Sequence, residues 1–377
     1  MHVAGGLYRE VCETPPWNKE FGSGVRAAAI LSKLSADTRF YTYRSSKGGE
    51  AVDHLERLGV DVVCERRSSD IAFSYFHPLS NPLILPAVVK VEDPLTVSGD
   101  SVLRFGFLEG SAIVSAGRAV YDPQGSSAVV PFEANGSQAT DLAIVLNEVE
   151  LLRYSGASDI EAACQALIDQ SRASVVVVKC GVRGALVVEL GQSSKIPPHW
   201  SERVFKIGTG DVFSAVFAHA WAEKKMPASA SAEIASKAVS LYCDAPNEPL
   251  PRLSTIARNP ITGSAPTCVS LRGSVETLGR RYSLEEARHC LQTLGMRVAA
   301  VDLGDTPVEE PDGPKTLLVL ADGLNLKEIY EIASRCEKAD RIVILDEEKR
   351  VQPWASVLIK DDFTTALYAS AWPVEIR

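Results

Sequence analysis

The sequence contains no Cys-x-x-Cys pair, although eight cysteines are spread over its 377 residues. We therefore expect neither a zinc ribbon nor a thioredoxin-type site, and we interpret most of the thiols as buried and free. The sequence also lacks a basic start followed by a long apolar core, and no apolar run approaches the roughly 20 residues of a membrane span. These absences favour a cytoplasmic protein that has no membrane partner.

The sequence also lacks an excess of positive charge. The chain has 39 Lys and Arg residues against 48 Asp and Glu residues, which gives a net charge of −9. Nucleic-acid binding depends on Lys and Arg side chains that match phosphates, so we expect no direct binding of nucleic acid. The composition is otherwise that of a globular protein, and the length suggests two or three domains.

Two stretches of the chain alternate apolar strands with helical patterns, and this alternation predicts parallel βαβ units with right-handed crossovers. Residues 65–105 differ, because Pro, Ser and Gly separate short strands there in a pattern typical of hairpins. In the first stretch the strand candidates include 119–121, 143–146 and 174–179, and the helix candidates include 25–34, 148–154, 160–170, 210–224 and 230–243.

The proline-rich residues 244–266 have no apolar period, which predicts a linker between the two stretches. A second series of strands and helices follows, and it predicts a small doubly wound α/β domain of the flavodoxin-like kind. We accordingly divide the chain into a domain at 1–253, a linker at 254–264 and a domain at 265–377.

The most informative segment is Gly208-Thr209-Gly210-Asp211, which precedes an apolar helical pattern. The two glycines let the backbone approach a ligand, and the N–H groups at the start of a helix suit phosphate. Asp211 would then accept a proton from an attacking hydroxyl while the N–H groups hold the transferring phosphoryl group. An ordinary tight turn with a capping Asp is the alternative.

Three further segments each allow a functional and a structural interpretation. Asn147 and Glu150 follow an apolar strand and share a helix face, where they suit either a hydrated Mg²⁺ or a simple cap. Gly181 and Gly184 form a turn that either covers a nucleotide or closes a hairpin. Gly22-Ser23-Gly24 either brings the backbone close to a sugar or forms a plain loop.

In this order and spacing the four segments resemble the ribokinase-like (PfkB) family of carbohydrate and nucleoside kinases over residues 1–253. The resemblance implies a three-layer α/β sandwich with a small β-lid at 65–105, and ATP and Mg²⁺ as cofactors. It also implies a small sugar or nucleoside as substrate, and a homodimer that forms through the strand edges of the lid.

The resemblance also implies roles for individual residues. The segment 208–211 matches the family's G-A-G-D motif, which would make Asp211 the catalytic base and Gly208, Thr209 and Gly210 the anion hole. The other matches are the N-x-x-E motif for Mg²⁺ and phosphate (Asn147, Glu150), the glycine turn under the nucleotide (Gly181, Gly184), the D-P-N strand end (Asp122-Pro123-Gln124) and the substrate site (Glu10, Gly24, Arg26).

Several positions depart from the family's pattern. Glu10 replaces its substrate-binding Asp, and Arg26 replaces its sugar-contacting Asn. Arg26 therefore indicates either an anionic substrate or the loss of the sugar site. Lys179 stands where Thr is common, and Phe205-Lys206-Ile207 replaces an Asp-Thr-Thr run. A non-catalytic protein that binds a nucleotide or a partner is one alternative to a kinase.

In the second domain, Asp322 follows a strand candidate and Glu331 lies on the next helix. This layout weakly resembles nucleoside 2-deoxyribosyltransferases, in which a carboxylate attacks the anomeric carbon of a sugar. A second alternative is therefore a deoxyribosyltransferase or N-glycosidase at Asp322 and Glu331, with the kinase-like domain as a nucleotide sensor. A purely structural or regulatory role for this domain is also open.

Overall fold

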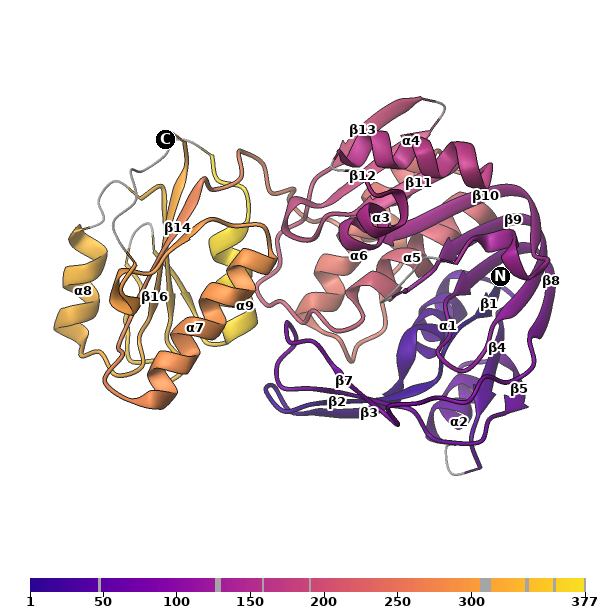
Figure 1. The fold of residues 1–377 in the computed structure, drawn as a ribbon, viewed down its shortest axis with the longest axis horizontal. Coiled ribbons are helices and arrows are strands. Elements are labelled where there is room, and N and C mark those ends of the chain that lie inside the picture. The colour runs from indigo at the N-terminus through magenta and orange to yellow at the C-terminus, as the bar shows by residue number, and fades with distance from the viewer. Residues whose placement is uncertain are drawn as a thin grey trace. The chain divides into compact units, whose positions relative to one another are not determined.

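The computed structural model describes residues 1–46, 49–125, 130–157, 159–189, 191–305, 313–335, 339–354 and 357–375. The chain forms two compact units (Figure 1). The first unit contains Met1–Cys180, Gly184–His199 and Lys206–Arg258, and the second contains Gly181–Arg183, Trp200–Phe205 and Asn259–Arg377. Within the described part of the chain, no helix is both long and apolar enough to cross a membrane.

A nine-stranded sheet forms the centre of the first unit, in the order β13-β12-β11-β10-β9-β8-β1-β4-β5. Neighbouring strands are parallel from β5 to β11, and β12 and β13 continue the sheet as antiparallel neighbours. The strands are β1 (His2–Ala4), β4 (Arg39–Arg44), β5 (Asp61–Arg66), β8 (Leu95–Phe105), β9 (Ala112–Asp122), β10 (Gln138–Asn147), β11 (Val175–Lys179), β12 (Ala185–Glu189) and β13 (Gln192–Ile196).

Helices cover both faces of this sheet, because its central strands are apolar on both sides. Helices α3 and α4 lie over one face of the sheet (Figure 1). Leu146, Leu151 and Val178 share one core cluster, whereas the equally buried Val145 and Val177 face the other side, as the strand period requires. The predicted three-layer α/β sandwich is confirmed. The helices are α1 (Gly22–Leu34), α2 (Glu50–Arg57), α3 (Glu148–Ser155), α4 (Ile160–Ser171), α5 (Thr209–Ala218) and α6 (Ala228–Asp244).

A separate four-stranded sheet, which we call the lid sheet, has the order β3-β2-β6-β7. Only part of the predicted lid at 65–105 belongs to it, because β8 pairs over its whole length with β9 in the main sheet. The other half of the lid sheet comes from the hairpin β2–β3 near the N-terminus. The lid strands are β2 (Tyr8–Cys12), β3 (Trp17–Phe21), β6 (Ala72–Tyr75) and β7 (Leu83–Leu85).

The second unit contains a five-stranded parallel sheet in the order β15-β14-β16-β17-β18. The second strand in the chain lies on one side of the first and the third on the other, so the predicted doubly wound domain is confirmed. Helices α7 and α9 cover one face, and α8 covers the other (Figure 1). The elements are β14 (Cys268–Gly273), α7 (Leu278–Thr293), β15 (Val298–Ala299), β16 (Lys315–Leu320), α8 (Leu326–Arg335), β17 (Arg341–Leu345), β18 (Val357–Lys360) and α9 (Phe363–Ala371).

The second unit also includes Trp200–Phe205, which the sequence-based division assigns to the first domain. The ring of Trp200 lies 5.0 Å from that of Trp372, and the Val204 amide donates to the Thr365 hydroxyl at 2.8 Å. Long-range packing of this kind leaves no local sequence pattern. The chain passes into the second unit at Arg258–Asn259, inside the residues interpreted as a linker.

Candidate active site

The segment 208–211 lies at the start of α5, a helix that is almost entirely apolar and buried. Gly208 has a φ of +81°, a conformation that glycine adopts without strain. Asp211 falls in the first helical turn and is only 8% exposed. The Thr209 amide donates to the Lys206 carbonyl at 3.2 Å, but no acceptor among the described residues is bonded to the amides of Gly210 and Asp211. These two amides are available to an anion.

Three strand ends meet beside this helix start. Asp122, Asn147 and Lys179 end the neighbouring parallel strands β9, β10 and β11. Asp122 is fully buried, and its Oδ2 accepts hydrogen bonds from Lys179 Nζ at 2.6 Å and from the Ser214 hydroxyl of α5 at 2.7 Å. Its Oδ1 is buried and has no partner among the described residues. A buried carboxylate oxygen without a hydrogen bond suits a cation.

Asn147 and Glu150 cap α3 reciprocally. The Asn147 side-chain oxygen accepts from the Glu150 amide at 2.9 Å, and Glu150 Oε2 accepts from the Asn147 amide at 2.8 Å. Burial raises the pKa of Glu150. The nearby Lys179 acts to lower this pKa, and the nearby Asp122 acts to raise it. The Asn147 oxygen is thus used in the cap, and for Mg²⁺ the better-fitting donors are Asp122 Oδ1 and the second oxygen of Glu150.

The backbone conformation of the turn after β11 accounts for its two glycines. Gly181 and Gly184 have φ values of +56° and +85°, and the Cys180 amide donates to the Gly184 carbonyl at 2.8 Å. A Cβ at Gly184 would lie 2.0 Å from the Ile196 carbonyl oxygen. Because β11 and β12 pair antiparallel across this turn, its geometry is that of a tight hairpin.

The residues expected to bind substrate come from the lid sheet and α1. Glu10 lies on β2, and its Oε1 accepts from the Gly22 amide at 3.2 Å. Gly24 lets α1 approach the main sheet, since a Cβ there would lie 2.6 Å from the carbonyl carbon of Gly5 and 2.5 Å from the Phe40 ring. The packing of α1 is therefore sufficient to explain this glycine.

Arg26 joins these residues to the expected base. Its side chain is 2% exposed, and its guanidinium donates through Nη2 to Glu10 Oε2 at 2.5 Å and through Nη1 to Asp211 Oδ2 at 2.6 Å. The Nε group donates to the Tyr242 hydroxyl of α6 at 3.1 Å, and the Phe21 ring lies 5.0 Å from Cζ. The structure therefore brings Glu10, Arg26 and Asp211 into one buried ionic cluster.

The same surroundings shift the pKa values of two groups. Burial raises the pKa of Asp211, Arg26 lowers it, and Glu10 raises it again. Burial and the nearby ammonium of Lys179 lower the pKa of Lys206, whose Nζ donates to the Thr209 hydroxyl at 3.2 Å. The start of α5 thus has positive side chains close to its free amides.

Two residues that bond to this cluster, Gln124 and Tyr242, had little or no signal in the sequence. Gln124 has a φ of +49° and donates through Nε2 to Asp211 Oδ1 at 2.7 Å, so both oxygens of this carboxylate accept hydrogen bonds. Its place after the Asp-Pro pair was the available clue. Tyr242 lies near the end of α6, an Ala- and Ser-rich helix, where its hydroxyl donates to the Ile207 carbonyl at 2.8 Å, and nothing in the local pattern distinguishes it.

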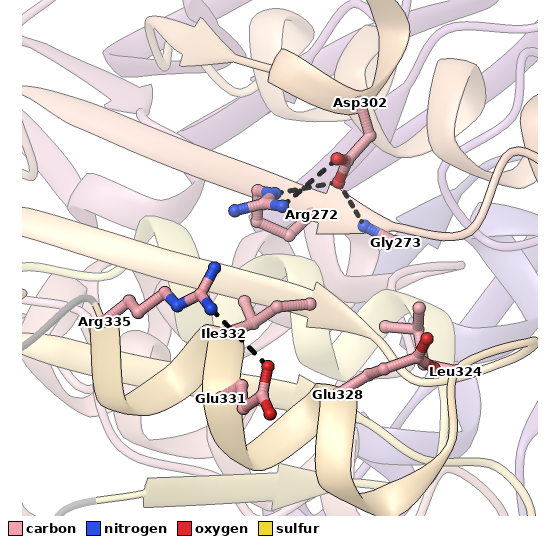
Figure 2. Close-up of a pocket in the computed structure, with 8 residues that line it drawn as sticks. All are labelled: Arg272, Gly273, Asp302, Leu324, Glu328, Glu331, Ile332 and Arg335. Carbon is pink, nitrogen blue, oxygen red and sulfur yellow. Dashed lines mark hydrogen bonds and ion pairs between the residues drawn. The ribbon is translucent and has the colours of Figure 1, made fainter.

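The second unit has a small cavity of about 160 Å³ at the carboxyl ends of β14 and β16 (Figure 2). Arg272 pairs with Asp302 at 2.8 Å, and Arg335 lies 3.6 Å from Glu331. Of the two residues singled out in the sequence, Glu331 lines the cavity, whereas Asp322 is not among its lining residues and pairs with Arg280 at 3.2 Å. The lining is Arg272, Gly273, Asp302, Leu324, Glu328, Glu331, Ile332 and Arg335.

Comparison with known proteins finds a family model that matches one segment of the chain and solved structures of similar fold. Residues 118–248 match the model of the pfkB family carbohydrate kinases. A putative ribokinase II from E. coli is 14% identical, with a TM-score of 0.51, and the match covers 68% of this chain and 97% of that one. A pyrophosphate-dependent myo-inositol-1 kinase, converted into a myo-inositol-3 kinase, is 17% identical, with a TM-score of 0.50 and coverage of 67% and 96%.

At such identities the likeness of the structures concerns the fold. A search of curated protein sequences found no match. The matched segment spans β9 to α6 and so contains the strand ends, the cap of α3 and the start of α5 described above. The first unit therefore has a ribokinase-like fold, and residues 118–248 within it match the model of the pfkB family carbohydrate kinases.

Proposed function

We propose that the first unit transfers a phosphoryl group from ATP to a hydroxyl of a small sugar or nucleoside. The observation that carries this proposal is the position of Asp211, a buried carboxylate beside two amides at the start of α5 that have no bonded acceptor among the described residues. A general base next to an anion-binding helix start is the pair of groups that phosphoryl transfer to a hydroxyl needs.

In the proposed step, the acceptor hydroxyl donates its proton to Asp211 as its oxygen bonds to the terminal phosphorus. The bond from that phosphorus to the leaving phosphate breaks, and the electron pair goes to the leaving group. The amides of Gly210 and Asp211 would stabilise the charge on the transferring phosphoryl group. Because these amides are fixed by the helix, they need not reorganise during the reaction.

The donor side is supported by two lysines. Lys179 Nζ would lie 3.4 Å from a Cβ built on Gly210, and Lys206 reaches Thr209 in the same turn. Lys206 has no ion pair with a carboxylate among the described residues, so a polyphosphate would supply the missing counter-charge. Mg²⁺, held by Asp122 and Glu150, would neutralise charge on the donor when bound.

Experiment must decide whether the phosphate donor is ATP or pyrophosphate. ATP is the donor that we propose, with the turn at Gly181–Gly184 beneath the nucleotide. Two solved structures of similar fold, both at a TM-score of 0.50, are described as pyrophosphate-dependent kinases, which makes pyrophosphate the necessary comparison. The two lysines would contact phosphate groups and not a nucleobase, so they suit ATP and pyrophosphate equally.

The test is to incubate the purified chain with Mg²⁺, either ATP or pyrophosphate, and a panel of sugars, polyols and nucleosides. Products are followed by ³¹P NMR, with the Asp211→Asn protein as the matched control. A phosphate ester that forms with the wild type alone supports the proposal. If no acceptor is phosphorylated with either donor, the non-catalytic alternative replaces it.

A homodimer through the lid sheet is part of the proposal. The edge strand β7 leaves Leu83 and Leu85 exposed at 63% and 48%, and the nearby Phe76 is 69% exposed. An apolar edge strand with unpaired backbone groups favours pairing with a second copy. Light scattering distinguishes the 40.6 kDa chain from its dimer.

The deoxyribosyltransferase or N-glycosidase alternative has one observation in its favour, the position of Glu331 in the cavity of the second unit. Glu331 would act as the nucleophile, but Arg335 lies beside it and Asp322 is turned to Arg280. Release of a free base from nucleosides, lost in Glu331→Gln, would establish this activity independently of phosphate transfer.

A further inference from the structure

The Arg26 guanidinium connects the proposed base to Glu10 on the lid sheet. It bonds to Glu10 and Asp211 at 2.5 and 2.6 Å, so the residues that resemble the family's sugar ligands contact one another directly. It also lies against the turn at Gly208, where a built Cβ would be 2.2 Å from Arg26 Cζ. The space between the base and the anion-binding turn is therefore filled by this side chain.

A general base works only on a hydroxyl within hydrogen-bond distance. Asp211 Oδ2 is bonded to Arg26 and Oδ1 to Gln124, and the carboxylate as a whole is 8% exposed. An acceptor hydroxyl can reach this carboxylate only if one of these two donors gives way. Arg26 is the larger obstacle, because its removal would also open the space beside Glu10 and Gly208.

We propose that Arg26 is a specificity-determining plug, which fills the acceptor place in the resting protein and yields only to an acceptor that offers new hydrogen-bond donors to Glu10 and Asp211. This inference rests on the proposed phosphotransfer site and names the acceptor class that the site takes. It assigns to Arg26 a role in selection, and the chemistry itself stays with Asp211.

The charges decide which acceptor can displace the plug. Moving the guanidinium away leaves Glu10 and Asp211 as two buried carboxylates with no cation between them, which is costly unless both gain donors. Neighbouring hydroxyls of a polyol, or an ammonium group, supply such donors. A phosphate or carboxylate supplies none and would be repelled. The site therefore favours neutral polyhydroxyl or amino acceptors over anionic ones.

This proposal differs from one expectation from the sequence. There, the positive charge of Arg26 indicated an anionic substrate as one possibility. In the structure the charge of Arg26 is already balanced by two carboxylates, which together raise its pKa against the effect of burial. An incoming anion would meet a cluster whose net charge is already negative.

The plug has a second consequence for the donor. While it is in place, no water molecule can occupy the acceptor position next to Asp211. If it were removed, water could donate a proton to Asp211 and form a bond to the terminal phosphorus, while the bond to the leaving phosphate breaks. Arg26 thus protects the donor from hydrolysis until an acceptor arrives.

The binding experiment measures affinities by calorimetry. The probes are the neutral compounds ribose, fructose and myo-inositol, and the affinity for each is compared with that for its phosphate monoester. The variants are Arg26→Asn and the double variant Glu10→Asp/Arg26→Asn. The double variant has the Asp and Asn of the family pattern, and it keeps the test valid if the single variant fails to fold. Arg39→Asn, at an exposed position on β4, is the matched control. Melting curves establish that each variant is folded.

We expect at least one neutral probe to bind either variant about tenfold or more tightly than the wild type, with no larger gain for its phosphate ester. Equal binding by the wild type and both variants, a larger gain for the esters, or no gain for any probe would overturn the plug. The Arg39 variant should bind like the wild type.

The second measurement is hydrolysis of ATP and of pyrophosphate without an acceptor. Arg26→Asn should raise it roughly tenfold or more, and Arg26→Asn/Asp211→Asn should abolish the increase. A gain in binding without transfer or hydrolysis by any variant would retain the plug and refute the proposed kinase. Equal phosphorylation of one acceptor by the wild type and Arg26→Asn would refute the plug and retain the kinase.

Discussion

Replacing Asp211 with Asn removes the base but keeps the size of the side chain, which makes it the most direct test of the proposed chemistry. A positioned general base contributes roughly 10²–10⁴-fold, or about 3–5 kcal/mol of activation free energy. Because Asp211 lies on a buried helix rather than a loop, the backbone amides should stay in place. We therefore expect the loss in kcat, with donor affinity changed by less than about threefold.

The structure also predicts the pH profile. Burial raises the pKa of Asp211, and the base must be deprotonated to act. The rate should therefore fall as pH falls through this raised pKa, at a higher pH than for an ordinary Asp. Arg26 lowers the same pKa, so Arg26→Asn should move the acid limb of kcat/KM further upward. In Asp211→Asn this limb should disappear.

The assay is the initial rate of ester formation against pH, with donor binding measured separately by calorimetry. Asp141→Asn is the control, because the Asp141 side chain on β10 is 41% exposed and, among the described ion pairs, pairs only with Arg118 at 3.1 Å. A near-normal kcat for Asp211→Asn, with an unchanged acid limb, would refute the assignment of the base.

Three further predictions concern stability. Glu109→Gln leaves the buried Arg67 without its carboxylate at 2.9 Å and should cost about 3–5 kcal/mol in urea unfolding. Gly184→Ala should lower Tm more than Gly136→Ala, because both have positive φ but only the former would meet a carbonyl oxygen. Burial lowers the pKa of His199 in the folded protein below its ordinary value of 6.5. The folded protein should therefore lose stability as pH falls from 6.5 through that lowered pKa, because the unfolded chain binds the proton more readily. His199→Gln should weaken this dependence of Tm on pH.

The strand and helix rhythm was predictable because it is local. Apolar runs such as Val175–Lys179 and the buried helix after Gly208 leave patterns within a few residues, and parallel strands bring their carboxyl ends to one edge. The positions of Asp122 and Lys179 at that edge follow from the same pattern. Their direct ion pair does not, since register decides which side chains touch.

The contacts of Arg26 lay beyond the reach of local reasoning. Its partner Asp211 is 185 positions away, and its partner Tyr242 is 216 positions away. The lid hairpin was missed for a different reason. Tyr8–Cys12 has an alternating burial pattern that the strand period explains, but five residues interrupted by charges give a weak signal.

Three of the departures from the family pattern introduce a cation, and the structure surrounds each cation differently. Arg26 is paired with Glu10 and Asp211, and Lys179 is paired with Asp122. Lys206 alone of these three has no carboxylate within ion-pair distance among the described residues, and its pKa is lowered by burial and by Lys179. Because a buried cation without a counter-charge gains most from an anion, the phosphate donor should approach the side of Lys206. Arg26, in contrast, already has its counter-charges and bonds directly to Asp211, which is why we propose that the acceptor displaces it.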